Sequence, residues 1–255
     1  MTRHPLLLAG LLLLLLWGAS SESTAATPPL TAGSRQLVVV VSDSFAASQG
    51  TLRRFEKTED TWTPVGESVP VLLGKNGMAW GRGLHPAEPG EQKREGDDKT
   101  PAGLFRLGMV LGDASQPPPG SHGIEYVQKT DRVAWIGHSG LPGNPPYNHL
   151  YRLPEGTEPP PWWAEEMMKP DVPAHAWMVL IEHNYPDSVP DAGSAIFFHI
   201  QRSPVRRSGG CTVMPREAIE SLIAWLDPQK KPVLAELPLP AYQARCAAWG
   251  LPPLE

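Results

Sequence analysis

The sequence predicts a mostly β protein with few helices, and three observations lead to this fold class. The chain of 255 residues contains 30 prolines and 24 glycines, which argue against a helical bundle. Many of its apolar residues occur in short, strand-like runs separated by Gly- and Pro-rich loops. Hydrophobic residues make up 41% of the chain, which is enough to bury a substantial core. We therefore expect one β-rich domain over residues 36–237.

The N-terminus has the composition of a secretory signal peptide. Arg3 and His4 precede an almost pure leucine run over residues 6–17, and small residues follow it. A membrane anchor is the alternative, but a spanning helix needs about 20 apolar residues. We predict a signal peptide over residues 1–26, cleaved near Ala19 or near Ala25 and Ala26, and a polar linker over 27–35. The mature protein is then expected in the periplasm or outside the cell, with no membrane span.

The first half of the predicted domain consists of strands and loops. Residues 36–41 form a β-branched run that is typical of a buried strand. Residues 52–57 and 61–65 flank a three-residue turn at 58–60, which predicts a hairpin. Shorter strands are predicted at 69–73, 105–110 and 132–136, and turn-rich loops at 74–103, 112–123 and 137–148.

The second half contains the clearest central strands, at residues 177–182 and 195–200, and a final strand at 233–237. A short helix is expected at 162–169. Residues 215–226 are the one convincing amphipathic helix, because Pro215 suits its first turn and its apolar residues form a single stripe. Residues 238–255 are set apart as a C-terminal tail of unassigned structure.

Cys211 is the strongest candidate for a chemical role. It ends the turn Ser208-Gly209-Gly210-Cys211, which follows the strand that carries His199. The glycines allow a sharp turn and bring backbone N–H groups close to a reacting carbonyl. The imidazole of His199 can take the thiol proton or hold the thiolate as an ion pair. These residues predict a cysteine nucleophile.

Only two cysteines are present, Cys211 and Cys246. In an oxidising compartment a disulfide between them is the simplest alternative. Because Cys211 lies in a glycine turn and Cys246 in an Ala-rich segment, we favour a free, reactive Cys211 and a packing role for Cys246.

Other classes of function have weaker support. The net charge is −5 and no basic cluster suits nucleic acid, so no nucleic-acid partner is expected. The histidines are scattered without metal-ligand spacing, so we expect neither a metal nor another cofactor. His138 and His183 are possible cleft residues. The pair Trp162-Trp163, which follows three prolines and reads as exposed, is considered as a glycan platform or a lid contact.

Several segments together resemble the L,D-transpeptidases of the YkuD-like family. Residues 193–199 leading to Ser208-Gly209-Gly210-Cys211 are similar to the catalytic core of that family. Residues 93–105 contain a Thr-Pro-x-Gly-x-Phe stretch that resembles the strand entry near its cleft. Residues 76–81 and 182–185 also resemble the sequences of members of its single-domain branch. The resemblance covers roughly residues 36–237, and it implies a single, sandwich-like β domain.

The resemblance implies a function in the bacterial cell wall. Such enzymes act on peptidoglycan stem peptides: the cysteine attacks the carbonyl of an L-centre, expels the terminal D-amino acid, and the acyl-enzyme is resolved by an amine or by water. Here Cys211 takes the nucleophile role and His199 the role of base. The backbone N–H groups of Gly210 and Cys211 are the implied oxyanion donors.

Two positions and one spacing depart from the family pattern. Gly209 stands where the family usually has a histidine, the spacing from His199 to Cys211 is shorter than usual, and Val213 stands where an arginine is frequent. We therefore consider Arg202, Arg206 and Arg207, in the compact loop between His199 and Cys211, as carboxylate ligands, or as solvated loop residues. Further candidate substrate-binding residues are Ser208, Gly209 and His138.

The sequence leaves three functions open: a transpeptidase that crosslinks peptides or attaches proteins to the wall, a carboxypeptidase, and a non-catalytic wall-binding relative. The state of Cys211 separates the last from the other two. A free thiol of low pKa within reach of His199 supports an enzyme, whereas a disulfide to Cys246 supports a binding module. The sequence does not predict the oligomeric state.

Overall fold

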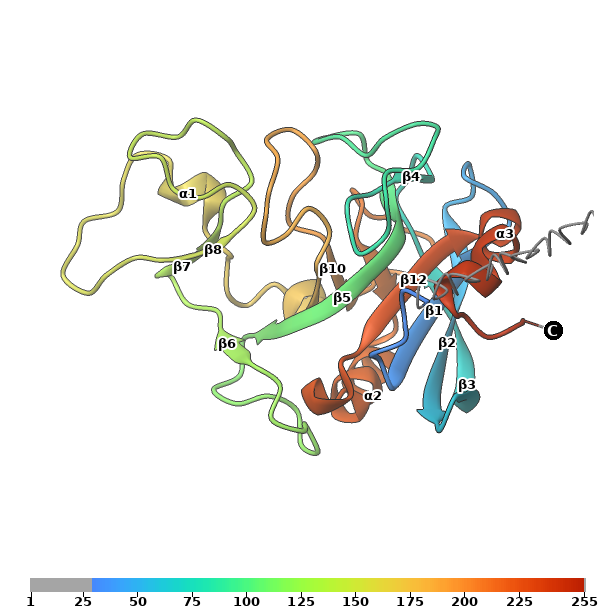
Figure 1. Ribbon diagram of the computed structural model, residues 1–255. Coiled ribbons are helices and arrows are strands. Elements are labelled where there is room, and N and C mark those ends of the chain that lie inside the picture. The colour runs from blue at the N-terminus through green and yellow to red at the C-terminus, as the bar shows by residue number, and fades with distance from the viewer. Residues whose placement is uncertain (1–28, 255) are drawn as a thin grey trace, which may run out of the picture.

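The fold is mostly β, as predicted, and consists of one β-rich domain (Figure 1). The computed structural model describes residues 29–254. The predicted signal peptide, residues 1–26, lies outside this range. No helix among residues 29–254 is long and apolar enough to cross a membrane.

Eight strands form a closed, barrel-like ring. The pairing order is β12, β1, β2, β3, β11, β10, β9 and β5, and an additional pairing of β5 with β12 closes the ring. The closed sheet thus surrounds one continuous core instead of enclosing it between two separate sheets. The strands of the ring are β1 (Gln36–Ser42), β2 (Gln49–Thr58), β3 (Thr61–Leu72), β5 (Thr100–Gly112), β9 (Trp177–Ile181), β10 (Phe197–Ile200), β11 (Thr212–Met214) and β12 (Val233–Pro238).

Strand β1 belongs to the main hydrophobic core, and three of its four consecutive valines, Val38 to Val40, are fully buried. It pairs in parallel with β12 and antiparallel with β2. The predicted hairpin is confirmed, because Thr58 pairs with Thr61 across the turn. The strand predicted at 69–73 is not separate: it is the end of β3, which runs from Thr61 to Leu72. Likewise β5 begins at Thr100, ahead of the predicted start, because its first residues pair with β4 (Met78–Trp80).

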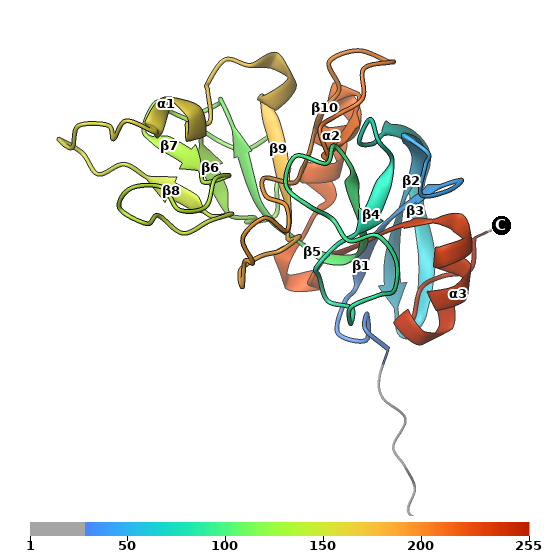
Figure 2. The same ribbon diagram turned by 90° about the horizontal axis from the view of Figure 1, so that it is seen from above.

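Two helices pack on the barrel, as both views show (Figure 1 and Figure 2). The amphipathic helix is confirmed as α2 (Arg216–Trp225), and its buried residues are Ile219, Leu222 and Ile223. The C-terminal tail forms α3 (Leu239–Trp249), which packs on β12 and β1. Its Tyr242 and Trp249 belong to the main core. A short turn, η2 (Pro228–Lys230), links α2 to β12.

The linker segment that precedes β1 is packed against the C-terminal helix. Thr31 is fully buried, and its hydroxyl donates a hydrogen bond of 2.9 Å to the Trp249 carbonyl oxygen. Residues 29–35 and α3 are thus parts of the same folded unit.

A lobe of irregular chain projects to one side of the barrel (Figure 2). It contains β7 (Val133–Trp135), β8 (Leu150–Arg152) and α1 (Trp163–Glu166), while β6 (Tyr126–Gln128) pairs with the end of β5. Helix α1 is shorter than the predicted helix at 162–169. The lobe has its own small core, and η1 (Pro173–His175) connects the lobe back to β9.

The expectation that Trp162 and Trp163 are exposed is wrong. Both lie in the core of the lobe, at 8% and 5% exposure. Their indole N–H groups donate to the carbonyl oxygens of Pro142 and Asp131, at 3.0 and 2.9 Å. The neighbouring loops therefore cover the two rings, and neither ring is a surface for glycan binding.

Candidate functional site

Cys211 and His199 lie on the same outer face of two adjacent strands. β10 and β11 pair in parallel, with Phe198 opposite Thr212 and His199 opposite Val213. Because successive side chains alternate between the faces of a strand, His199, Val213 and the preceding Cys211 share one face. Phe198 belongs to the main core inside the barrel, whereas Cys211 packs with a second cluster outside it. The two candidate catalytic residues are therefore neighbours on the barrel wall.

The turn before Cys211 is held by its own hydrogen bonds. The Ser208 hydroxyl donates to the Cys211 carbonyl oxygen and accepts the Gly210 N–H at 3.0 Å. Gly210 has a φ of 141°, and a Cβ there would lie 3.0 Å from the carbonyl oxygen of Lys99. Only glycine fits this conformation and this close approach. In this structure the Gly210 N–H, an expected oxyanion donor, is thus bonded to Ser208.

Cys211 is a free, half-buried thiol, and Cys246 is free as well. Cys211 Sγ lies 3.5 Å from the carbonyl oxygen of Ala195, to which it donates. Burial raises the pKa of Cys211 to about 11, although the cations of Lys93 and Arg202 oppose the shift. The low thiol pKa expected of an enzyme is therefore absent: the resting thiol is protonated, because burial outweighs the nearby positive charges.

His199 is buried and is oriented by the backbone. Its Nδ1 lies 2.9 Å from its hydrogen-bond partner, the carbonyl oxygen of Ile200. Since a carbonyl oxygen only accepts, Nδ1 carries the hydrogen in this contact, and Nε2 is then the basic nitrogen of the neutral ring. The backbone carbonyl of Ala174 is a second hydrogen-bond partner of the imidazole. Burial also lowers the pKa of His199. At neutral pH a neutral imidazole therefore lies near a neutral thiol, and the two groups do not form an ion pair in the resting site.

Both residues line a single cavity of about 430 Å³. Four of the substrate-binding candidates predicted from the sequence also line it: Arg202, Arg206, Ser208 and Gly209. The cavity also contains Arg207, which was considered with the other loop arginines, and Val213, which stands at the position of the missing family arginine. Three further residues of the cavity were not expected from the sequence: Lys75, Asp98 and His175. No local pattern marks these residues, because they come from segments far apart in the sequence.

The cavity is rich in positive charge. Lys75 is paired with Asp98 at 2.7 Å, and Arg207 is tied to Ser48 by a 2.9 Å hydrogen bond. By contrast, no hydrogen bond or ion pair engages the guanidinium groups of Arg202 and Arg206 among residues 29–254. The positive charge of Arg202 contributes to lowering the pKa values of His175, His199 and Cys211. Arg202 is therefore a free cation close to the thiol and both imidazoles.

His175 is a second imidazole in this cavity. It lies in η1, and its ring packs edge to face on the ring of His199, with 4.9 Å between the ring centroids. Burial lowers the pKa of His175 to about 4, and nearby cations add to the effect. Both imidazoles are therefore neutral at neutral pH.

The other histidines considered from the sequence lie elsewhere. His138 is exposed and pairs with Glu166 in the lobe, which raises the pKa of the imidazole. It does not line the cavity of Cys211. His183 is fully buried, and both of its ring nitrogens are bonded to the backbone, to Arg82 N–H at 3.1 Å and to the Ala192 carbonyl oxygen at 2.9 Å. In the described chain, no cluster of three or more His, Cys, Asp or Glu could hold a metal ion.

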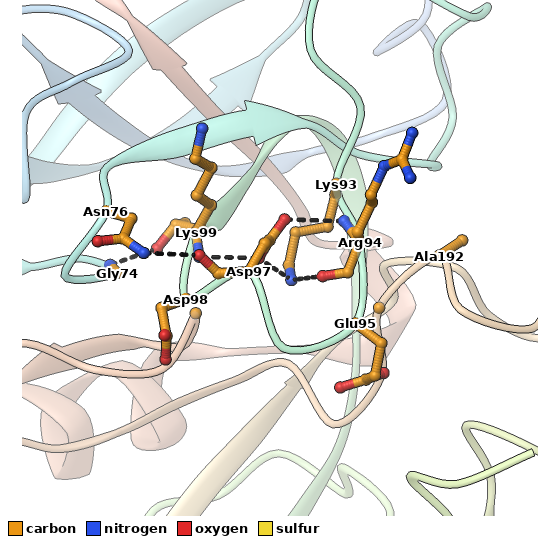
Figure 3. A network of polar contacts seen from close by, with 12 residues as sticks. Gly74, Asn76, Lys93, Arg94, Glu95, Asp97, Asp98, Lys99 and Ala192 are labelled. Carbon is orange, nitrogen blue, oxygen red and sulfur yellow. Dashed lines mark hydrogen bonds and ion pairs between the residues drawn. The ribbon is translucent and has the colours of Figure 1, made fainter.

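A polar network around Asp97 holds the segment of residues 93–99 (Figure 3). The Asp97 carboxylate accepts bonds from Lys93 Nζ at 2.6 Å and from the N–H groups of Arg94 and Lys99 at 2.8 and 2.9 Å. The Lys93 side chain is only 3% exposed. The Lys99 carbonyl oxygen lies against Gly210, so the network shapes the segment on which the turn rests.

The site combines a free thiol with an oriented imidazole on the wall of a β barrel. This arrangement is typical of proteins that transfer acyl groups through a cysteine. A family model for the L,D-transpeptidase catalytic domain, YkuD, matches residues 39–234, and the chain therefore belongs to that family. The resemblance noted in the sequence is confirmed. No curated protein matches the chain.

Among solved structures, that of Bd1075 from Bdellovibrio bacteriovorus is similar, with 16% identity and a TM-score of 0.38. The match covers 79% of this chain and 47% of the other, so the chain spans about half the length of that structure.

We expect Asp97→Asn to destabilise the protein strongly, because it leaves the buried ammonium of Lys93 without a carboxylate partner. Loss of one partner of a buried pair costs about 3–5 kcal/mol in the free energy of unfolding. The matched control is Asp98→Asn, whose partner Lys75 is 59% exposed. The control should cost about 0–1 kcal/mol. Denaturant unfolding of both variants measures the difference, and equal losses would contradict the assignment.

The raised pKa of Cys211 predicts the pH dependence of its alkylation. The thiolate is the reactive form, so in the Cys246→Ala background the iodoacetamide rate should rise about tenfold per pH unit from roughly pH 7 to 9. Mass spectrometry after timed quenching measures this rate. A rate independent of pH over that interval would instead indicate a thiolate already held by His199.

Proposed function

We propose that this protein is a peptidoglycan L,D-transpeptidase that works through an acyl-enzyme on Cys211. Members of its family act on peptidoglycan peptides. The observation that carries the proposal is the position of His199 and Cys211 on one face of paired strands, lining one cavity. The unpaired state of Cys211 supports an enzyme over a wall-binding relative in which Cys211 is paired with Cys246.

In the first step, the sulfur of Cys211 attacks the carbonyl carbon of an L-centre in the stem peptide. His199 Nε2 accepts the thiol proton as the C–S bond forms. The C–N bond to the terminal D-amino acid then breaks, and the leaving amine takes that proton from His199. The result is a thioester on Cys211 and a neutral His199. Proton transfer concerted with attack fits a site in which burial disfavours charge on both groups.

In the second step, an acceptor amine attacks the thioester and forms a new amide bond. A proton lost by the amine is returned through His199 to the departing thiolate, which regenerates the resting pair. Water in place of the amine would give a carboxypeptidase, and the product therefore separates the two activities.

The oxyanion formed in each step is assigned to the backbone N–H groups of Cys211 and Gly210. The Gly210 N–H is engaged by the Ser208 hydroxyl at 3.0 Å in the free protein. Substrate binding must therefore displace the hydroxyl from this N–H. Hydrogen bonds of catalytic groups frequently tighten or rearrange when substrate binds, so this exchange is compatible with the role.

Arg202 and Arg206 are assigned to a carboxylate of the stem peptide. Both line the cavity, and among residues 29–254 their guanidinium groups have no hydrogen-bond or ion-pair partner, so each can bind a carboxylate through two parallel hydrogen bonds. Arg207 is less suited, because its guanidinium already bonds Ser48 and the Val205 carbonyl oxygen. The leader predicted over residues 1–26 would deliver the enzyme to the cell envelope, where its substrate lies.

Incubation with a carbapenem should give a single covalent adduct, because a reactive thiol in such a site accepts this acyl donor. Intact-protein mass spectrometry should show the adduct in the wild type and in Cys246→Ala, but not in Cys211→Ala. His199→Ala should slow its formation about 100-fold or more, the usual contribution of a general base. An adduct that persists in Cys211→Ala, or that is lost in Cys246→Ala, would contradict the assignment. Stem peptides with and without an acceptor amine then distinguish transfer from hydrolysis.

Arg202→Gln should raise KM for a stem tetrapeptide by about tenfold or more, since a charge-assisted hydrogen bond contributes about 1.5–3 kcal/mol. The control substrate is the same peptide with an amidated C-terminus, for which wild type and variant should be similar. The control variant is Arg216→Gln, on the exposed face of α2. An equal loss on the acid and the amide would assign Arg202 to another role.

A further inference from the structure

A buried hydrogen bond crosses the interior of the barrel directly behind the nucleophile. The Thr212 hydroxyl donates to Glu236 Oε1 at 2.5 Å, and both residues are fully buried. Thr212 begins β11, and Glu236 lies in β12. Three strands separate β11 from β12 in either direction around the ring: β1, β2 and β3 on one side, and β5, β9 and β10 on the other. The bond therefore joins opposite walls of the barrel.

Strand alternation connects this bond to the site. Thr212 faces inward beside Phe198, while Cys211 and Val213 face the outer cavity. The first residue of β11 thus holds the inner bond, and the residue just before it carries the thiol. Any movement of Thr212 moves the Cys211 carbonyl group and, with it, the turn closed by Ser208.

The carboxyl group of this bond carries a free-energy cost, because it lies in the interior of the barrel. Glu236 Oε2 has no hydrogen-bond partner among residues 29–254. Burial raises the pKa of Glu236 to about 8, so the side chain is largely protonated at neutral pH. A buried, incompletely paired acid is less favourable than an apolar residue of similar size. A contribution to the stability of the fold therefore does not explain the carboxyl group of Glu236. Its hydrogen bond to Thr212, the residue after the nucleophile, does explain it.

We infer that Glu236 is a positioning residue for the reaction: its hydrogen bond to Thr212 holds the start of β11 so that Cys211 stays aligned with His199. This inference rests on the proposed function. Glu236 does not line the cavity, and its contact with the strand that leads to Cys211 is the bond to Thr212. Its charge also contributes to raising the pKa of Cys211, so Thr212→Val, which keeps the carboxyl group, isolates the positioning effect. A displacement of about 1 Å at a reacting group can cost roughly 100-fold in rate, so a bond that fixes one strand end has a large effect on turnover.

The test compares variants that remove or keep the bond. Thr212→Val removes the hydroxyl at almost constant shape, and Thr212→Ser retains it. Glu236→Gln keeps an acceptor for the hydroxyl, and Glu236→Met removes it. The double variant Thr212→Val with Glu236→Met removes both partners of this bond and leaves neither of them unpaired, so it should fold even where a single variant does not. Thr63→Val, on an exposed position of β3, is the control.

Turnover of a stem peptide should separate the variants. We expect Thr212→Val, Glu236→Met and the double variant to lower kcat about 10- to 100-fold with KM nearly unchanged. Thr212→Ser, Glu236→Gln and Thr63→Val should stay close to wild type. The double variant should lose no more than either single one, since all three lack the same bond. Full kcat in folded variants without the bond, or failure of every one of them to fold, would overturn the positioning role.

The alkylation rate of Cys211 is a second measurement of the positioning role, and it needs no substrate. In the Cys246→Ala background, loss of the bond frees the start of β11 and should raise the rate at which iodoacetamide modifies Cys211 at neutral pH by roughly tenfold. This is the effect of lowering the thiol pKa by one unit. If the wild type forms no acyl-enzyme, the proposed function fails, yet this rate still reports whether the bond positions the thiol. If acylation occurs and neither kcat nor the alkylation rate changes, this inference alone fails.

Discussion

The parallel pairing of β10 with β11 is the constraint on which the rest of the site depends. Its register places His199 opposite Val213, and strand alternation then brings Cys211 to the same outer face. A shift of one residue would turn either the thiol or the imidazole into the barrel. The register is held from inside by Phe198 and Met214 in the main core, and it is held beyond the strand by the glycine turn that packs on Lys99.

Burial and positive charge oppose each other around the thiol. Burial raises the pKa of Cys211 and lowers that of His199, so both groups are neutral before substrate binds. Lys93 and Arg202 pull the thiol pKa down without overcoming burial. A protonated thiol is a poor nucleophile, so the resting site limits unwanted reactions of Cys211. In the reaction that we propose, the thiol is activated only when a substrate carbonyl and His199 meet the sulfur.

Much of the fold followed from local patterns in the sequence. The β-branched run at β1, the hairpin between β2 and β3, and the apolar stripe of α2 are visible in neighbouring residues, and all three are present. Local patterns gave wrong or no predictions where contacts between distant residues determine burial and secondary structure. Trp162 and Trp163 read as exposed after three prolines, but loops from residues 131 and 142 accept their N–H groups and cover them. The tail showed no clear pattern, because α3 is stabilised by packing on β12 and β1.

The sequence by itself determined the mostly β class, the strands that carry His199 and lead to Cys211, and the glycine turn between them. These features depend on residues within a few positions of one another. Only the tertiary structure decided that Lys75, Asp98 and His175 share the cavity of Cys211, and that Glu236 bonds Thr212 across the barrel. The physical reason is that the pairings of β11 with β3 and of β10 with β9 bring the cavity segments together, while closure of the ring through β5 and β12 places Glu236 across from Thr212. No local periodicity records which strands will meet.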